Sequence, residues 1–209
     1  MEKFYSQFGQ DIWVCDFFNY KKNGYFLDIG AYDGIEYSNT YYLEKKLNWT
    51  GICIEASSLN FNKLMKADRS CIRLHNAVYN QNKIVQFPAA GGLGAGLRIG
   101  DNQATEDVEA LTLKTILKNN NSPNLIDYVS LDIEGFEYEA LLGFPFKEYE
   151  VIMWTIEHNL YNIGAETILL KSNILNIMTK NGYKLVKENV GSSPLWPAED
   201  WYINVKYIK

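Results

Sequence analysis

The segment Asp28-Ile29-Gly30-Ala31-Tyr32-Asp33-Gly34 places two carboxylates and two glycines directly after the apolar residues Phe26 and Leu27. An apolar lead-in is typical of a central parallel strand, and open α/β sheets bind ligands at the carboxyl ends of such strands. A dinucleotide fingerprint, G-x-G-x-x-G, faces a pyrophosphate with bare amides, whereas Asp28 and Asp33 would repel phosphate. The segment therefore predicts a site for a positively charged nucleoside without phosphate, and S-adenosylmethionine fits that description.

Glu55 ends a second apolar run, Ile52-Cys53-Ile54, and comes 25 residues after Gly30. That spacing fits the next strand of a β-α-β unit, where an acid can accept hydrogen bonds from both ribose hydroxyls. We therefore assign Glu55, with Ala56 beside it, to the nucleoside site.

Three acids lie at the end of a third run: Asp132, Glu134 and Glu137. Because side chains alternate along a strand, Asp132 and Glu134 can face one cleft, where mutual repulsion raises one pKa or attracts a cation. Glu137 lies one turn into the next helix, where an acid complements the helix dipole. We therefore interpret Asp132 as functional and Glu137 as a helix acid.

A fourth run ends in Glu157 and His158, a carboxylate beside one of the two histidines of the chain. The imidazole lies where a doubly wound fold places its site, next to a carboxylate that can orient it. We predict that His158 acts in catalysis, and we interpret the other histidine, His75, as structural.

The order of these runs indicates the scaffold, because short apolar runs alternate with helical periods, as in a parallel sheet covered by helices. We predict strands over Tyr25–Ile29, Gly51–Glu55, Cys71–Asn76, Tyr128–Asp132, Val151–Glu157, Tyr183–Glu188 and Trp201–Lys206. We predict helices over Gln7–Phe18 (with Ser6 as N-cap), Tyr37–Lys46, Leu59–Ala67, Thr112–Lys118, Phe136–Leu142 and Glu166–Lys180. Between the third and fourth strands lies an insertion with a short run, Lys83–Phe87, and a glycine-rich loop, Pro88–Leu97, which is either a lid over the acceptor site or a solvated connection.

Composition sets the broad class. The chain has 209 residues, 47% hydrophobic and 22% charged, which suits one ordered α/β domain over residues 1–209. The net charge of −5 and the lack of a basic run argue against nucleic-acid binding and favour a neutral or cationic acceptor. No apolar stretch predicts a membrane span, and the first residues lack the pattern of a signal peptide, so we expect a cytoplasmic protein. The odd number of cysteines predicts small core residues rather than a zinc or disulfide framework.

Five segments together resemble the FkbM family of S-adenosylmethionine-dependent methyltransferases. They are Tyr5–Asp11, Leu27–Gly34, Ser38-Asn39-Thr40, Asn76-Ala77-Val78 and Asp132-Ile133-Glu134-Gly135-Phe136-Glu137. The last segment is the most specific, because the glycine turn alone indicates only a class I methyltransferase. The resemblance implies a Rossmann-like fold with a seven-stranded, mostly parallel sheet and helices on both faces. It also implies O-methylation of a sugar, glycan or polyketide hydroxyl.

The resemblance also assigns residues of the cofactor site. It places the turn from Asp28 through Gly30, Ala31, Tyr32 and Asp33 around the methionine portion, Glu55 on the ribose, and Asn76 and Ala77 near the adenine. Gln7 and Ser38 are expected at the carboxylate end of the cofactor, and Asp132 beside the transferred methyl group.

We expect an in-line displacement in which a hydroxyl attacks the methyl group, with His158 as general base oriented by Glu157 or Asp132. In a variant, Asp132, Glu134 and Glu157 bind a divalent metal ion that lowers the pKa of the hydroxyl. The alternative from another class is a noncatalytic module that binds S-adenosylmethionine or a glycan within a larger glycan-modifying protein. Aromatic residues such as Trp196 and Trp201 could stack on a sugar acceptor, although core packing explains a tryptophan equally well.

Overall fold

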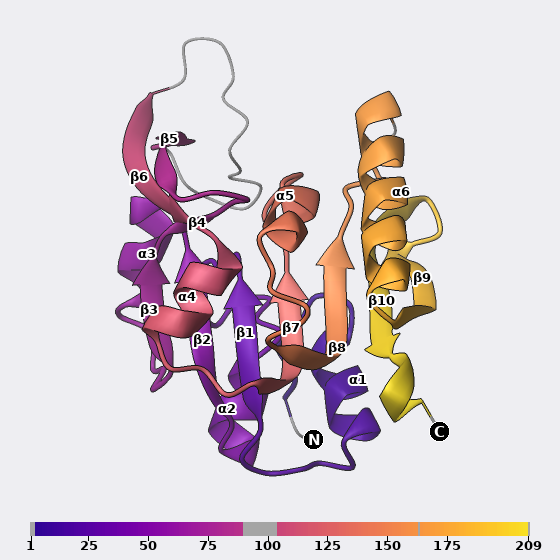
Figure 1. The fold of residues 1–209 in the computed structure, drawn as a ribbon. Coiled ribbons are helices and arrows are strands. Elements are labelled where there is room, and N and C mark those ends of the chain that lie inside the picture. Colours follow the sequence, from indigo (N-terminus) through magenta and orange to yellow (C-terminus); the bar gives the residue numbers. More distant parts are fainter. Residues whose placement is uncertain (1–2, 90–103, 163, 209) are drawn as a thin grey trace.

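The computed structural model describes residues 3–89, 104–162 and 164–208, which form a large and a small β-sheet (Figure 1). In this part of the chain the large sheet has seven strands in the order β3-β2-β1-β7-β8-β10-β9. They are β1 (Tyr25–Ile29), β2 (Thr50–Glu55), β3 (Ile72–His75), β7 (Leu125–Leu131), β8 (Glu150–Glu157), β9 (Tyr183–Ser193) and β10 (Trp196–Asn204). β10 runs antiparallel to both of its neighbours, β8 and β9, and every other pair of neighbouring strands in this sheet is parallel. The predicted seven-stranded, mostly parallel sheet is confirmed.

Helices cover both faces of this sheet. They are α1 (Gln10–Phe17), α2 (Tyr41–Leu47), α3 (Ser58–Leu64), α4 (Leu113–Asn119), α5 (Glu137–Leu142) and α6 (Ala165–Lys180). Alternation along β1 divides the core, because Leu27 and Ile29 pack in one cluster with α4, α5 and α6, whereas Phe26 packs in another with α1, α2 and α3. Burying each such side chain contributes about 1.5–3 kcal/mol. These two cores fix the strand ends that carry the polar residues.

A second, three-stranded sheet was not predicted. It has the order β4-β6-β5, from β4 (Ala77–Val78), β6 (Thr105–Leu111) and β5 (Lys83–Pro88). The prediction missed β6 because its sequence is mostly polar and buries only Val108 and Ala110. Figure 1 shows β5 and β6 beyond the carboxyl end of the large sheet, so this insertion adds a wall to the site.

Two predicted helices begin later than expected. The first starts at Gln10 with Gly9, at φ 83°, as its N-cap, so the prediction of Ser6 as N-cap was wrong. The Ser6 hydroxyl instead donates to Asp11 Oδ1 at 2.5 Å. The second starts at Tyr41, because Tyr37 adopts a left-handed φ of 57° that interrupts a helix.

Most of the predicted glycine-rich loop, from Ala90 onward, lies outside the described residues. Among the residues that the structure describes, no helix is both long and apolar enough to cross a membrane.

Candidate functional site

The turn after β1 is held in place by its glycine. Gly30 has a φ of 87°, and a Cβ atom at this position would lie 1.7 Å from the carbonyl oxygen of Asp132. The amides of Gly30 and Ala31 donate to the carbonyl of Ile54, at 2.9 and 3.0 Å. The sharp turn therefore needs glycine, and it joins the ends of β1, β2 and β7 at one point.

Asp28, at the end of β1, is buried in a polar network. Its Oδ2 accepts from the Thr40 hydroxyl at 2.6 Å, and Arg69 Nη2 donates to the same hydroxyl at 2.8 Å. Arg69 is itself buried and pairs with Glu44 at 2.7 Å. Burial raises the pKa of Asp28, and Arg69 and Thr40 oppose that rise. The network fixes the carboxylate against the turn that follows β1.

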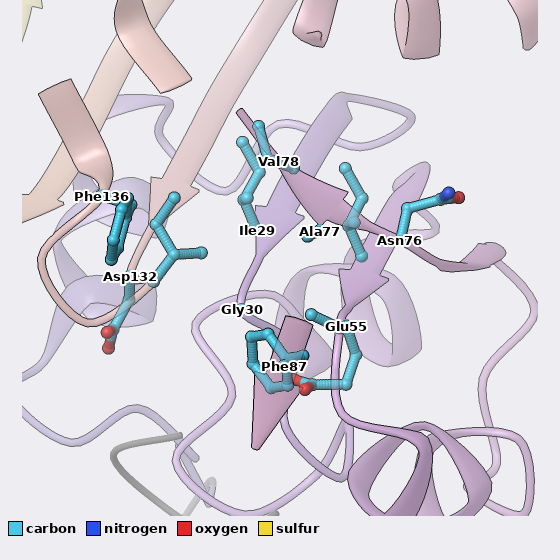
Figure 2. A pocket seen from close by; sticks show the side chains of 12 residues that line it. Ile29, Gly30, Glu55, Asn76, Ala77, Val78, Phe87, Asp132 and Phe136 are labelled. Carbon is cyan, nitrogen blue, oxygen red and sulfur yellow. The ribbon is translucent and has the colours of Figure 1, made fainter. Parts of the chain in front are cut away.

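Glu55 lies in a pocket of about 390 Å³ at the ends of β1 and β2. Its carboxylate accepts from the amides of Tyr32 and Ser57, at 2.9 and 2.8 Å. Burial raises the pKa of Glu55 to about 7. Figure 2 shows Glu55 and Phe87 on one side of this pocket, with Asp132 and Phe136 on the other. Its remaining lining residues are Ile29, Gly30, Ile54, Ala56, Asn76, Ala77, Val78 and Ile133.

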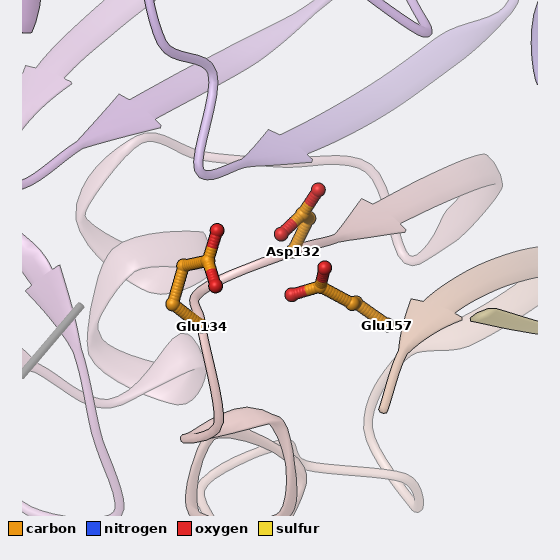
Figure 3. Close-up of side chains that lie close together, drawn as sticks. All are labelled: Asp132, Glu134 and Glu157. Atoms are coloured by element: carbon orange, nitrogen blue, oxygen red, sulfur yellow. The ribbon is translucent and has the colours of Figure 1, made fainter. Parts of the chain in front are cut away.

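A wider cleft of about 1140 Å³ adjoins this pocket, and Gly30 and Asp132 line both. Asp132, Glu134 and Glu157 converge in it, with ligand atoms that all lie within 4.8 Å of one another (Figure 3). Burial raises the pKa of Asp132, and burial with repulsion from Asp132 raises the pKa of Glu157 well above its ordinary range. Burial also raises the pKa of Glu134 to about 7. The three groups hold at least one proton unless a cation joins them.

Glu137 supports the loop between β7 and α5. Its carboxylate is fully buried and accepts from the amides of Ile133 and Gly135, at 2.9 and 3.1 Å. Glu134 and Gly135 both have a left-handed φ, at 59° and 101°. Glu137 therefore stabilises a strained loop that presents Asp132 and Glu134 to the cleft.

His158 does not line either pocket, although it follows Glu157 directly. Its side chain is 1% exposed, its Nδ1 accepts from the Leu160 amide at 3.2 Å, and its Nε2 lies 3.4 Å from Asp200 Oδ1. Asp200, rather than Glu157 or Asp132, orients the ring. This position does not fit the predicted role of general base, because both ring nitrogens face the protein interior.

The structure brings together most of the residues predicted to bind the cofactor. Glu55, Ala56, Asn76 and Ala77 line the smaller pocket, whereas Gln7, Asp28, Ala31, Tyr32 and Ser38 line the cleft. Asp33 lines neither, because its Oδ1 accepts from the amides of Ile35 and Glu36, both at 2.8 Å, and closes the turn. His75 is tied to the carbonyl of Ala56 and stacks on Phe61, in line with a structural role. The three cysteines are buried, and none of them forms a disulfide within the described residues.

Most of the chain matches one protein family. Residues 28–185, more than half of the chain, match the family described as the methyltransferase FkbM domain. The chain belongs to the FkbM methyltransferase family. No curated protein matches the chain.

Solved structures share the fold of this FkbM domain. The methyltransferase FkbM from Methylobacillus flagellatus KT has a TM-score of 0.56 and 16% identity, over 87% of this chain and 43% of that protein. The O-methyltransferase from Bacillus cereus, solved in complex with SAH, has a TM-score of 0.53 and 13% identity, over 93% of this chain and 80% of that protein. At these identities the likeness shows the fold, which is that of a class I Rossmann-like methyltransferase. The FkbM domain spans less than half the length of the Methylobacillus protein.

Sequence reasoning missed several residues that line the cleft of the FkbM domain. Asn39 and Ser130 come from different elements and are joined by a hydrogen bond of 2.8 Å from Asn39 Nδ2. Glu199 reaches the cleft because it lies opposite Glu157 in the antiparallel register of β10 on β8. Trp201 is buried in the core, whereas Trp196 lines the cleft and stacks on Tyr161. The registers that place Ser130 and Glu199 there join segments far apart in the sequence and leave no local signal.

Proposed function

We propose that this FkbM domain is an S-adenosylmethionine-dependent O-methyltransferase that acts on a hydroxyl of a sugar or glycan. The observation that carries the proposal is the meeting of two pockets at Gly30 and Asp132. The smaller pocket suits a nucleoside, because apolar residues line most of it and the carboxylate of Glu55 stands at one side to accept from ribose hydroxyls. The cleft matches the methionine portion and an acceptor that must reach the methyl group.

The side chains of the site fit this cofactor. Glu55 accepts one amide on each oxygen, and a carboxylate has capacity for further donors such as ribose hydroxyls. Asn39 Oδ1 is buried without a hydrogen-bond partner among the described residues, and it can accept from the cofactor's ammonium. A nicotinamide dinucleotide would instead place its pyrophosphate against Asp28 and Asp132. The acids of the site therefore favour a cofactor with positive charge.

When bound, S-adenosylmethionine supplies an activated methyl group, whose bond to sulfur breaks as an acceptor oxygen bonds to the carbon. The oxygen must lose its proton, and Glu157 or Asp132 receives it in place of the first candidate, His158. Both carboxylates lie in the cleft wall, and burial favours the protonated form of each, which is the form that proton uptake produces. Holding the two reactants in line lowers the activation barrier by about 7–11 kcal/mol.

Calorimetric titration with S-adenosylhomocysteine tests the cofactor site. We expect micromolar binding to the wild-type protein and at least a tenfold loss in Glu55→Ala. Glu148→Ala, which removes an exposed carboxylate outside both pockets, is the matched control and should bind normally. Absence of binding to a folded wild-type sample would overturn the proposal. Methyl transfer to any acceptor would exclude the noncatalytic module.

Several finer points stay predictions. The carboxylates of Asp132, Glu134 and Glu157 are oxygen ligands of the type that Mg²⁺ or Ca²⁺ prefers, and activity measured with and without EDTA tests the predicted metal site. A cytoplasmic location and membership of a larger glycan-modifying protein also stay predictions.

A further inference from the structure

The cleft has charge of one sign. Its charged lining residues, within the described ranges, are all acidic: Asp28, Glu36, Asp132, Glu134, Glu157 and Glu199. S-adenosylmethionine carries a net charge of about +1, from an ammonium, a sulfonium and one carboxylate. Positive charge from a ligand stabilises the ionised forms of these acids, and a cationic acceptor adds to the charge that S-adenosylmethionine brings.

Two of these acids already have partners within the protein. Asp28 accepts from the Thr40 hydroxyl, and Glu199 accepts from the indole of Trp201 at 2.5 Å. Glu157 differs, because it is 7% exposed and its Oε2 is buried with no hydrogen-bond partner among the described residues. Figure 3 shows the Glu157 carboxylate directed toward Asp132 and Glu134. Asp132 and Glu157 hydrogen-bond to each other when one of them is protonated, and a ligand that donates to Glu157 Oε2 takes the place of that shared proton.

Two aromatic rings lie beside the same acids. Tyr161 and Trp196 line the cleft and stack with their ring centroids 4.9 Å apart and their planes at 3°. Burial raises the pKa of Tyr161, and the nearby carboxylates of Glu157 and Glu134 raise it further. Trp196 is 50% exposed, which leaves ring surface for a ligand. Organic ammonium ions bind to aromatic faces that lie next to carboxylates. Mg²⁺ and Ca²⁺ instead bind oxygen ligands and do not require the rings.

We infer that the acceptor carries a protonated amine next to its reacting hydroxyl, as a 2-amino sugar does. This inference rests on the proposed function. The ammonium binds Glu134 and the rings of Tyr161 and Trp196, and the neighbouring hydroxyl donates to Glu157 Oε2. The 4.8 Å within which the acids lie accommodates an ammonium and a hydroxyl on adjacent carbons. In the transfer, the hydroxyl oxygen would bond to the methyl carbon as the carbon–sulfur bond breaks and S-adenosylhomocysteine leaves with the electron pair, the hydroxyl proton would pass to Glu157 or Asp132, and the amine would keep its protons.

Three matched sugars test the inference: D-glucosamine, N-acetyl-D-glucosamine and D-glucose. Each is titrated calorimetrically into the complex of the protein with S-adenosylhomocysteine, and each is then offered as an acceptor. We expect glucosamine to bind about tenfold more tightly than the two neutral sugars. In Glu134→Gln this preference should fall below about threefold while the affinity for S-adenosylhomocysteine stays within about twofold. Glu139→Gln removes a charge outside both pockets and should keep the preference.

Four results would overturn the inference and leave the proposed function standing. They are equal binding of the three sugars, a preference that survives in Glu134→Gln, a product methylated on nitrogen, and binding of neutral sugars that requires Mg²⁺ and disappears with EDTA. Failure of the wild-type protein to bind S-adenosylhomocysteine would instead overturn the proposed function itself, and this inference with it.

Discussion

The two pockets of the site differ in how they are built. The pocket around Glu55 is small and is lined mainly by apolar residues from the ends of β1, β2 and β4. The cleft is larger and acidic, and its walls come from elements as distant in sequence as Gln7 and Glu199. The first pocket suits one fixed ligand group, whereas the second has charge to position a reacting partner. Binding and chemistry should therefore respond to different substitutions.

Gly30→Ala should have the largest effect, because Gly30 belongs to both regions. The new methyl group would collide with the Asp132 carbonyl, and alanine is strained at a φ of 87°. We expect a loss of stability of about 3 kcal/mol or more and no measurable binding of S-adenosylhomocysteine. Thermal denaturation and calorimetry measure the two effects.

Gly182→Ala is the matched control for that substitution. Gly182 has nearly the same φ, 86°, but nothing lies within 4 Å of the position that its new methyl group would take. Only the backbone strain remains, so we expect a cost of about 1–2 kcal/mol and normal ligand binding. Equal destabilisation by the two substitutions would show that contact with Asp132 does not hold the turn.

Glu157→Gln should separate the two regions, because Glu157 lines only the cleft, and Asp132→Asn, at a residue that lines both, is its companion. Both remove a proton acceptor from the cleft and leave the contacts of Glu55 intact. We expect the rate of methyl transfer to fall about 10²- to 10⁴-fold and the affinity for S-adenosylhomocysteine to change less than about threefold. Glu55→Gln should show the opposite pattern, with weaker binding and a nearly normal rate at saturation. A rate that survives both cleft substitutions would exclude carboxylate base catalysis.

The difference between the smaller pocket and the cleft also explains which site residues the sequence could predict. Gly30 and Glu55 stand at the ends of strands that local apolar patterns identify, so a parallel sheet brings them together without further information. Glu199 reaches the cleft only because β10 pairs antiparallel with β8 in one register. The strand predicted from the sequence begins at Trp201 and leaves Glu199 outside it. Pairing register between distant segments is set by packing, and no local pattern in one sequence reports it.

For His158, a local pattern predicted a role that the burial of the side chain does not favour. Its position after a strand and beside a carboxylate indicated catalysis. Successive side chains at a strand end, however, point to opposite faces of the sheet. Glu157 faces the cleft, and His158, as the next residue, faces the other way toward Asp200. The sequence places both residues at the carboxyl end of the strand. The alternation of side chains decides which of the two reaches the cleft.

His158→Gln sharpens this point, with a smaller expected effect than the cleft substitutions. It removes a buried ring that meets Leu160 and Asp200, so we expect a loss of about 1–3 kcal/mol of stability. On the proposal that the proton acceptor is a carboxylate, the pH dependence of methyl transfer should keep its shape. Loss of the acid-side fall in rate in His158→Gln, with the cleft carboxylates unchanged, would restore the imidazole as base.

The smallest effect concerns the stability of the unliganded protein against pH. Burial raises the pKa of Glu55 to about 7 and that of Glu199 to about 8, so the folded protein holds these protons more tightly than the unfolded chain does. Their contribution is fully present below the ordinary glutamate value near 4.5 and is lost as pH rises through the folded values. The melting temperature should therefore fall between about pH 5 and pH 8, on the order of 5 °C.

The pH dependence of the melting temperature should distinguish the acid of the smaller pocket from that of the cleft. Glu55→Gln should flatten the decline up to about pH 7, and Glu199→Gln should flatten it up to about pH 8. A ligand that brings positive charge into the cleft favours the ionised acids there, so glucosamine with S-adenosylhomocysteine should reduce the decline that Glu199 causes. A melting temperature that rises with pH over this window would mean that these carboxyls are ionised in the folded protein, and it would contradict their raised pKa values.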